Sequence, residues 1–306
     1  MYDLTPYGFE VLDKLGEGGA GSVYRARQIS LDRLVAIKFL PRQSALVGDS
    51  LERFRIEARI AASLKHPNIV QVYEAGSCEG GYFFVMELVS GYSVANWLMR
   101  KGMLSEENSL LIAQYISDAL QYAWSAAQIL HGDIKPANIM VDGDGAIKLA
   151  DFLALTPPGG AARPESLRSH IVGTPNYMSP EQALGRDTLD FHTDIYSLGA
   201  VLYHLVTGHI PFEQETDVHG LMRKQIAEQI PDPLEYNPDL SPACAWLIEK
   251  MMIKRSEERY ESWPEVQQDI QRVKDGQLPA EPLPKHNEST VGRSLLRDQA
   301  APGIPV

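Results

Sequence analysis

A run of small residues near the N-terminus could bind phosphate. Residues 16–23 read GEGGAGSV and fit the pattern G-x-G-x-x-G-x-V, whose glycines let backbone amides approach phosphate oxygens. A dinucleotide-binding turn would need a helix directly after the glycines, but this chain continues as an alternating strand, and the next strand ends at Lys38. A P-loop would need Lys followed by Ser or Thr where Ser22 and Val23 stand. The remaining interpretation is a glycine-rich hairpin followed by a strand that carries a lysine.

A second cluster, of charged and amide side chains, follows later in the chain. Residues 131–138, here named the HGD loop, read HGDIKPAN, and residues 150–152 read ADF. With VAIK at residues 35–38, these motifs resemble the protein kinases, and bacterial receptor-like serine/threonine kinases in particular. The resemblance runs in order from residue 9 to residue 273. A lone lysine or aspartate at a strand end is usually solvated, so it is the ordered set that indicates the kinase fold.

The resemblance implies a role for each polar group of this cluster. Asp133 accepts the proton of the substrate hydroxyl, and Lys135 steadies the γ-phosphate. Asn138 and Asp151 hold Mg²⁺, and Asp151 connects the metal to the β- and γ-phosphates. Thr174 bonds Asp133 and Lys135, which is a feature of the serine/threonine class. The implied reaction is phosphoryl transfer from ATP to a protein hydroxyl.

The resemblance also implies a slot for ATP between two lobes. Lys38 holds the α- and β-phosphates and pairs with Glu57 of the following helix. The backbone of Glu87 and Val89 bonds adenine, and Met86 is the gatekeeper behind it. The other residues of this set are Leu15, Gly16, Glu17, Gly18, Gly19, Ala20, Gly21, Val23, Ala36 and Met140. The implied cofactors are ATP and Mg²⁺, for which Mn²⁺ can substitute.

Five residues are implied to support the site structurally: His131, Phe152, Glu181, Asp194 and Arg259. Asp194 lies in a buried helix that anchors the HGD loop, and Arg259 pairs with Glu181 across the lower lobe. Residues 173–181, GTPNYMSPE, resemble the peptide-docking end of the activation segment. The implied partners are therefore proteins with serine or threonine acceptors, and a small-molecule phosphotransferase is disfavoured.

Two positions depart from the kinase pattern. Gly132 replaces the arginine that, in many kinases, pairs with a phosphate on the activation segment. We hypothesise that phosphorylation of that segment is not the main switch of this protein. Leu153 stands where glycine usually follows Asp-Phe, and it restricts the backbone beside Asp151. Two functions stay open: an active serine/threonine kinase, and a pseudokinase that binds nucleotide or recruits partners as a scaffold.

The hydrophobic pattern predicts an α+β fold, and the resemblance implies that this fold is the bilobal protein-kinase fold. Short alternating runs before residue 90 indicate about five antiparallel strands, interrupted by one helix at residues 50–64. Helical periods dominate afterwards. We expect a kinase domain at residues 9–275, with an N-lobe at 9–89 and a C-lobe at 90–275. Residues 276–306 hold several prolines and little periodicity, so we expect a disordered tail.

Two patterns that could bind metal have simpler explanations. Residues 142–145, DGDG, begin like a calcium loop, but the twelfth position holds Leu153 instead of a bidentate acid, so they indicate a hairpin turn. The eight histidines show no metal-binding spacing. His204 and His209 are expected in the core and in a loop.

Composition limits the remaining function classes. The 306 residues are 44% apolar and 22% charged, as in ordinary globular proteins, and the net charge of −12 disfavours binding to nucleic acid. Two cysteines cannot form a disulfide framework. The N-terminus has no signal-peptide pattern, and the most apolar stretch, at residues 195–206, is too short to span a bilayer. These features predict a cytoplasmic protein with no membrane span, and the resemblance adds a homodimer through the small lobe.

Overall fold

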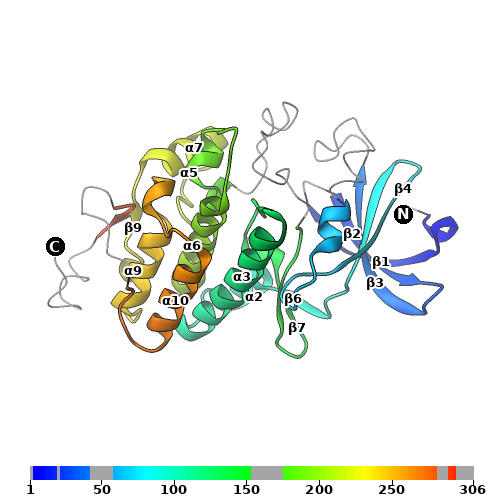
Figure 1. Ribbon diagram of the computed structural model, residues 1–306, viewed down its shortest axis with the longest axis horizontal. Coiled ribbons are helices and arrows are strands. Elements are labelled where there is room, and N and C mark those ends of the chain that lie inside the picture. The colour runs from blue at the N-terminus through cyan, green and yellow to red at the C-terminus, as the bar shows by residue number, and fades with distance from the viewer. Residues whose placement is uncertain (1–2, 19–20, 42–57, 153–174, 281–288, 294–306) are drawn as a thin grey trace.

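A small lobe rich in strands and a larger helical lobe lie side by side (Figure 1). The computed structural model describes residues 3–18, 21–41, 58–152, 175–280 and 289–293. This arrangement confirms the predicted α+β, bilobal architecture. Of the helix predicted at residues 50–64, residues 58–63 are helical and residues 50–57 lie outside the described part.

The small lobe is an antiparallel sheet of five strands in the order β1-β2-β3-β5-β4. Its strands are β1 (Phe9–Gly18), β2 (Gly21–Gln28), β3 (Arg33–Pro41), β4 (Val72–Cys78) and β5 (Gly81–Met86), with the short 3-10 helix η1 (Thr5–Tyr7) before β1. All five strands were predicted, because each is a short alternating or strand-like apolar run between turn-forming residues.

The central strand β3 is buried on both faces, and successive side chains point to opposite sides. Ile37 packs on one face in a cluster with Phe83, whose ring contacts Tyr7 of η1 edge-on. Ala36 packs on the other face with Phe84 and Met86. Lys38 is two residues from Ala36 and therefore lies on this second face. The alternation thus delivers one lysine into an otherwise apolar layer.

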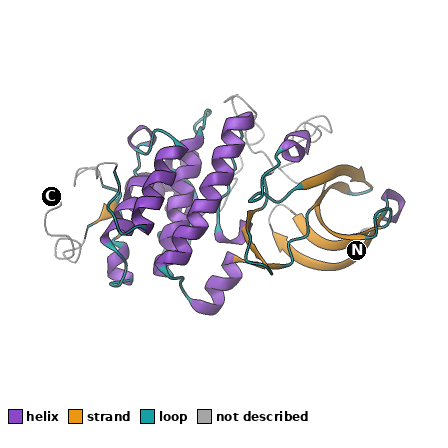
Figure 2. Cartoon of the chain, turned by 60° about the horizontal axis from the view of Figure 1, so that its bottom comes forward, coloured by secondary structure: helices purple, strands orange, loops and turns teal. Residues whose placement is uncertain are grey.

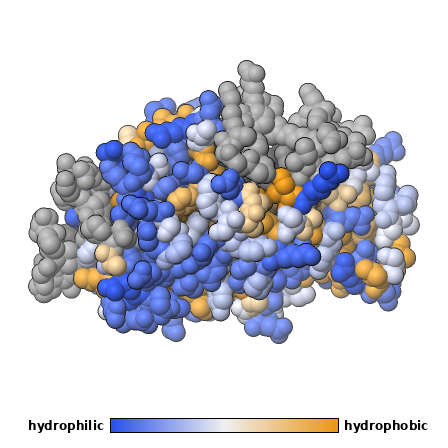
Figure 3. All heavy atoms as spheres, viewed as in Figure 1, coloured by the Kyte–Doolittle hydropathy of each residue, from blue (hydrophilic) through white to orange (hydrophobic). Residues whose placement is uncertain are grey.

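The helical lobe is built around helices far apart in the sequence that lie next to one another (Figure 2). Its helices are α2 (Val94–Lys101), α3 (Glu106–Ala127), α5 (Pro180–Ala183), α6 (Phe191–Thr207), α7 (Val218–Ala227), α8 (Pro233–Tyr236), α9 (Pro242–Met251) and α10 (Trp263–Lys274), with 3-10 turns η2 (Pro136–Asn138), η3 (Pro175–Tyr177) and η4 (Ser256–Glu258). On the face of this lobe that Figure 3 shows, hydrophilic residues cover most of the described surface and apolar residues appear in small patches. No described helix combines the length and apolar character that crossing a bilayer requires.

Helix α6 is the centre of the helical lobe. It begins at the N-cap Asp190, whose carboxylate accepts the amide of His192, and it ends at Gly208 in the left-handed conformation. Almost every residue between them is buried, and α3 and α9 pack against it. Such a helix, buried on all sides, holds its residues rigidly and can fix the loops that contact it.

A small sheet lies where the two lobes meet. It has the order β6-β7-β8, formed by β6 (Gly91–Ser93), β7 (Ile139–Asp142) and β8 (Ile147–Leu149). The turn between β7 and β8 is closed by the Asp142 carboxylate, which accepts the amides of Asp144 and Ala146. The interpretation of DGDG as a hairpin turn is confirmed. Leu149 bonds to the chain near Ile69, which fastens this sheet to the segment entering β4.

The expectation of a disordered tail is wrong for residues 289–293. There the chain forms β10 (Val291–Gly292), which pairs in parallel with β9 (Ile230–Pro231). Val291 is only 1% exposed. Arg293 donates to the buried Glu249 carboxylate of α9, with Nη2 2.9 Å from Oε1, and the Ser289 hydroxyl donates to the same oxygen. A buried ion pair and an apolar side chain therefore hold this segment on the helical lobe.

Candidate functional site

Lys38 and Asp151 meet between the lobes. The Lys38 Nζ atom lies 2.9 Å from Asp151 Oδ1, and the lysine side chain is almost fully buried. Burial raises the pKa of the Asp151 carboxyl, but the charge and hydrogen bond of Lys38 more than offset this and leave the pKa below its ordinary value. Asp151 is therefore an anion at neutral pH.

Asp133, Lys135 and Asn138 form a second polar group in the HGD loop. The Lys135 ammonium donates to Asp133 Oδ2 at 2.6 Å, and the Asn138 amide nitrogen donates to the Asp133 backbone carbonyl at 2.8 Å. The Ala150 amide in turn donates to the Asn138 carbonyl. Asn138 thereby links the loop that carries Asp133 to the residue just before Asp151.

His131 also connects the HGD loop to the segment that carries Asp151. Its Nδ1 accepts the Asp133 amide at 3.2 Å, so we assign the ring proton to Nε2, which lies 2.9 Å from the Ala150 carbonyl and donates to it. The ring also packs edge-on against Phe152, with centroids 4.8 Å apart. These contacts fix the spacing between Asp133 and Asp151, in agreement with a packing role for His131.

Asp194 of α6 holds the HGD loop by its backbone. Its two carboxylate oxygens accept the amides of His131 and Gly132, each at 2.8 Å. Burial raises the pKa of this carboxyl, and the two amide hydrogen bonds oppose that rise. The rigid helix α6 therefore positions the residues next to Asp133.

Gly132 has a backbone conformation that explains its residue type. Its φ is +70°, in the left-handed region that glycine occupies at little cost. Its amide bonds Asp194, as described above, and its carbonyl accepts the side-chain amide of Gln182 at 2.8 Å. Both polar groups of the residue that precedes Asp133 are thus held by buried side chains.

Gln182 was not predicted as a site residue. It lies in the four-residue helix α5, where Ser179 and Gln182 form a capping box that locks the glutamine side chain. The sequence S-P-E-Q at residues 179–182 fits the S-x-x-Q capping pattern, so the cap could have been found from sequence. The bond from Gln182 to Gly132, fifty residues apart, could not.

We expect Gln182→Leu to lower kcat for phosphoryl transfer about tenfold while KM for ATP stays within about twofold, because it frees the carbonyl beside Asp133 without touching the nucleotide slot. Steady-state kinetics measures both constants. Gln271→Leu, on the exposed face of α10, is the matched control and should leave kcat unchanged. A lower melting temperature with an unchanged kcat would limit Gln182 to a structural role.

Glu181 and Arg259 form a buried ion pair beneath the site. Arg259 Nη1 and Nη2 donate to the two Glu181 oxygens at 2.7 and 2.9 Å, and Nε donates to the Ile253 carbonyl at 2.7 Å. Burial raises the pKa of the Glu181 carboxyl, but the hydrogen bonds and charge of Arg259 keep the pKa below its usual value. The predicted contact between these residues is present, and it fixes α5 to the chain that precedes α10.

Several of the predicted adenine-binding residues pack together where the sheet of the small lobe meets the segment joining the lobes. Met86 ends β5 opposite Ala36 of β3, and the cluster that contains both also includes Val23 and Val89. Met140, on β7 across the lobe boundary, is half-buried. These positions fit an apolar slot for an aromatic base.

Glu87 has a contact that sequence reasoning missed. Its carboxylate lies 3.0 Å from the Lys148 ammonium of β8, and its backbone amide donates to the Gln71 carbonyl. The side chain therefore ties the connecting segment to the helical lobe, and the role of the Glu87 backbone with adenine stays a prediction. A lone lysine on a short strand carried no signal for this pairing.

The glycine-rich hairpin is described in part. Gly18 pairs with Gly21 at the end of the β1–β2 ladder, and Gly16 pairs with Val23. A Cβ at Gly21 would lie 2.0 Å from the Phe39 carbonyl oxygen, and its φ is +146°, so only glycine fits there. Leu15 and Glu17 are exposed on β1. Gly19, Ala20, Glu57, Leu153 and Thr174 lie outside the described residues, and so their roles stay predictions.

The oxygen atoms of Asn138 and Asp151 suit a metal ion that also binds water and phosphate. Among the described residues, no group of three or more His, Cys, Asp or Glu side chains is placed to enclose a metal ion. Asp151 and Asn138 can offer one carboxylate and one amide oxygen. Mg²⁺ in phosphoryl-transfer sites is usually held by one or two protein oxygens together with water and substrate phosphates. The residues present therefore suit Mg²⁺ bound jointly with a nucleotide.

Comparison with known proteins agrees with this geometry. The protein kinase domain family matches residues 9–270. Serine/threonine-protein kinase PrkC of Bacillus subtilis is 36% identical over 267 residues, which cover 87% of this chain and 40% of that protein. Serine/threonine-protein kinase PknB of Mycobacterium tuberculosis is 34% identical over 278 residues, covering 90% and 44%.

A solved structure shows the same fold. The PknI kinase domain of Mycobacterium tuberculosis superposes with a TM-score of 0.68 at 25% identity, covering 87% of this chain and 96% of that one. The chain spans only about two fifths of the length of PrkC and PknB. Because the family match covers most of the chain and reaches from the glycine hairpin to α10, this chain belongs to the protein kinase family, in its bacterial serine/threonine group.

Proposed function

We propose that this domain transfers the γ-phosphoryl group of ATP to serine and threonine hydroxyls of proteins, with Mg²⁺ as the metal and Mn²⁺ as a substitute. The observation that carries the proposal is the polar network joining Lys38, Asp151, Asn138 and Asp133 between the lobes. Phosphoryl transfer depends on positioned charges of these kinds: a cation for the phosphates, oxygen ligands for the metal and an acceptor for the hydroxyl proton.

Each side chain would contribute one part of the reaction. Lys38 would bind phosphate oxygens, and Asn138 and Asp151 would hold the metal, which offsets negative charge on the β- and γ-phosphates when bound. Asp133 would orient the attacking hydroxyl and accept its proton. Lys135, now bonded to Asp133, would shift to the γ-phosphate. These roles follow if ATP binds between the lobes next to the side chains described above.

A pseudokinase is the second candidate, and the backbone at Asp151 bears on it. Asp151 has φ +66°, a left-handed conformation that aspartate adopts more readily than most residues. In this conformation the carboxylate still meets Lys38. The two sequence departures, Gly132 and Leu153, therefore leave the polar network of the described residues assembled, which supports the active enzyme over the scaffold.

The test is mass spectrometry of the protein incubated with Mg·ATP and a basic acceptor protein, together with its melting temperature with and without ATP. We expect phosphate on serine or threonine and a higher melting temperature with ATP. Lys38→Met should lose both effects, whereas Lys274→Met, at the exposed end of α10, should keep them. Stabilisation by ATP without any phosphate transfer would favour the pseudokinase.

The proposal extends to location and assembly. ATP and Mg²⁺ are abundant in the cytoplasm, so we place the domain there. The small lobe exposes several large apolar side chains, among them Leu12, Leu31 and Leu34. In a homodimer through this lobe, contact between such side chains of two copies would remove them from water, and sedimentation of the protein at increasing concentration would detect it.

A further inference from the structure

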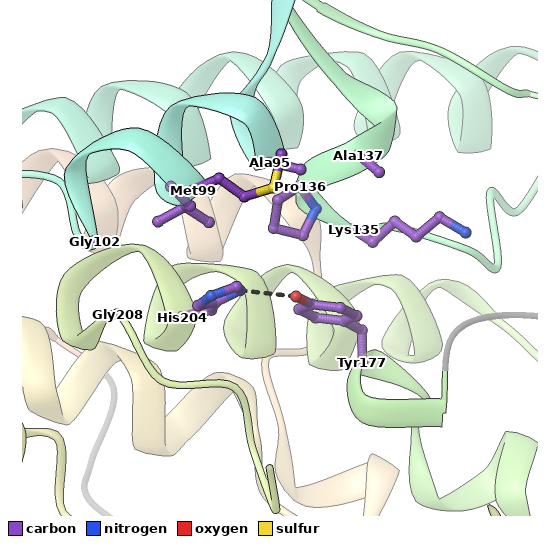
Figure 4. A pocket seen from close by; sticks show the side chains of 10 residues that line it. Ala95, Met99, Gly102, Lys135, Pro136, Ala137, Tyr177, His204 and Gly208 are labelled. Atoms are coloured by element: carbon purple, nitrogen blue, oxygen red, sulfur yellow. Dashed lines mark hydrogen bonds between the residues drawn. The ribbon is translucent and has the colours of Figure 1, made fainter. Parts of the chain in front are cut away.

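A pocket of about 490 Å³ opens beside the HGD loop (Figure 4). Helix α2 forms one wall with Leu98 and Met99, and the HGD loop forms another with Pro136 and Ala137. Tyr177 of η3 and His204 of α6 lie opposite them. None of the residues assigned to the ATP slot lines this pocket, so it is a separate recess that shares only Lys135 with the phosphoryl-transfer site.

The Tyr177 hydroxyl and the His204 imidazole at the base of the pocket form a hydrogen bond with each other. The Tyr177 hydroxyl lies 2.7 Å from His204 Nδ1, as the dashed line in Figure 4 marks. Burial lowers the pKa of His204 to about 4 and raises the pKa of Tyr177. At neutral pH the hydroxyl therefore donates to an uncharged imidazole, and this bond leaves the base of the pocket without charge.

The remaining lining is mostly apolar. Ala95, Leu98, Met99 and Pro136 contribute carbon atoms, and Ala137 is too small to close the pocket. Met99 is 78% exposed, so a large apolar side chain stands in water at the rim. The single charge in the lining is Lys135, whose ammonium is paired with Asp133. A cationic group would find no counter-charge among these residues, and the one cation is already paired with Asp133.

Lys135 also sets the distance from the pocket to the reacting group. Its stem lines the pocket and its Nζ lies 2.6 Å from Asp133 Oδ2. A lysine side chain spans roughly two residues of extended peptide, about 6–7 Å. A peptide whose hydroxyl reaches Asp133 would therefore bring a side chain two or three residues away over this pocket.

We propose that this pocket binds a large apolar side chain of the protein substrate, such as leucine, methionine or phenylalanine, two or three residues from the phosphorylated serine or threonine. This inference rests on the proposed kinase function and adds to it the class of substrate. The occupant follows from continuity of the pocket with the HGD loop, from its uncharged base and from the exposed Met99 that a bound apolar group would cover. The pocket is larger than one such side chain, so it can accept any of the three.

The test uses serine peptides in which each position within five residues of the acceptor is varied in turn. We expect leucine, methionine or phenylalanine to raise kcat/KM about tenfold or more over alanine at one position, two or three residues from the serine, while arginine and aspartate do not. Phosphorylation with no apolar preference at those positions, or with a preference for arginine, would overturn the inference and leave the kinase function standing. If no peptide and no acceptor protein is phosphorylated, the kinase proposal fails, and the inference fails with it.

A pair of variants ties the preference to this pocket. Met99→Glu places a carboxylate at the rim and should reduce the leucine-to-alanine ratio of kcat/KM about fivefold or more. Met103→Glu introduces the same charge on an exposed methionine outside the pocket and should leave that ratio unchanged. An apolar preference that Met99→Glu does not alter would mean that another surface reads the substrate, which overturns the assignment of this pocket.

Discussion

Replacing Asp133 with asparagine is expected to lower kcat for phosphoryl transfer by about 10²–10⁴-fold, the usual contribution of a positioned acid or base. Asparagine keeps the size of the side chain but cannot accept the hydroxyl proton, and its bond to Lys135 loses one charge. The Asn138 side chain bonds the backbone carbonyl of residue 133, so that contact is retained. The rate of peptide phosphorylation at saturating Mg·ATP measures the effect.

Two controls separate chemistry from binding and folding in this experiment. Asp144→Asn removes a carboxylate from the exposed turn between β7 and β8 and should leave kcat unchanged. The Asp133→Asn protein should still be stabilised by Mg·ATP, because Lys38 and Asp151 are intact. A kcat that falls less than about threefold would contradict the role proposed for Asp133.

The largest effect on stability is expected from Arg259→Met. The arginine side chain is 0% exposed, and its five donors include two bonds to Glu181 and bonds to the carbonyls of Ile253 and His192. Methionine fills similar space but leaves the buried Glu181 carboxylate without its counter-charge, with the Thr193 hydroxyl still donating to it, and removes the arginine donors from several carbonyls. Breaking a buried pair from one side costs about 3–5 kcal/mol, so we expect the melting temperature at pH 7 to fall by roughly 10 °C.

The matched control for that variant is Arg255→Met, four residues earlier. Arg255 is 66% exposed and pairs with Glu257 and Glu258 at the surface. Exposed pairs contribute about 0–1 kcal/mol, so calorimetry should show a much smaller change. An equal fall in melting temperature for the two variants would show that the buried Glu181–Arg259 pair stabilises the fold no more than an exposed pair does.

The cost of losing Arg259 should also depend on pH. The pKa of Glu181 in the folded protein lies below its ordinary value of 4.5. The pair therefore contributes fully above about pH 4.5, and its contribution is lost as the pH falls through the folded-state pKa. Without the arginine, burial should raise the pKa of Glu181 above 4.5, so the variant takes up a proton and its deficit should shrink between pH 7 and pH 4.5.

The fold and the main polar cluster were predictable because they are encoded locally. Strand β3, predicted at residues 33–40 and observed at Arg33–Pro41, alternates between two faces of the sheet and so places Lys38 by periodicity alone. Helix α6, predicted at residues 190–207 and observed at Phe191–Thr207, carries its own cap and glycine stop. Motifs of adjacent residues then give Asp133, Asn138 and Asp151 their positions relative to these elements.

Contacts between distant segments were not predictable. Gln182 bonds the carbonyl of Gly132 because α5 and the HGD loop both pack near α6, and no short pattern encodes that meeting. His204 was expected in the core, yet it lines a pocket together with Tyr177. These two residues are 27 positions apart, so no local pattern indicates that they meet. The sequence showed that position 132 holds glycine where many kinases have arginine. Only the structure shows that this residue has a left-handed φ, which suits glycine.

The tail was mispredicted for a related reason. Strand β10 has two residues, too few for an alternating pattern, and it pairs with an equally short β9 that lies sixty-one residues before it. Its charged anchor, Arg293, reads as a solvated residue in a proline-containing segment. Only the burial of Glu249 in α9 reveals that this arginine has a partner.

The pair formed by Glu249 and Arg293 also sets an order of events during synthesis of the chain. The two residues are 44 positions apart, and the Glu249 side chain is 0% exposed in the finished protein. A ribosome that adds about 5–20 residues per second reaches the arginine about 2–9 s after the glutamate. During that interval α9 carries a carboxylate whose burial without this cation is costly. We therefore expect the nascent helical lobe to complete its packing only after residue 293 has been made.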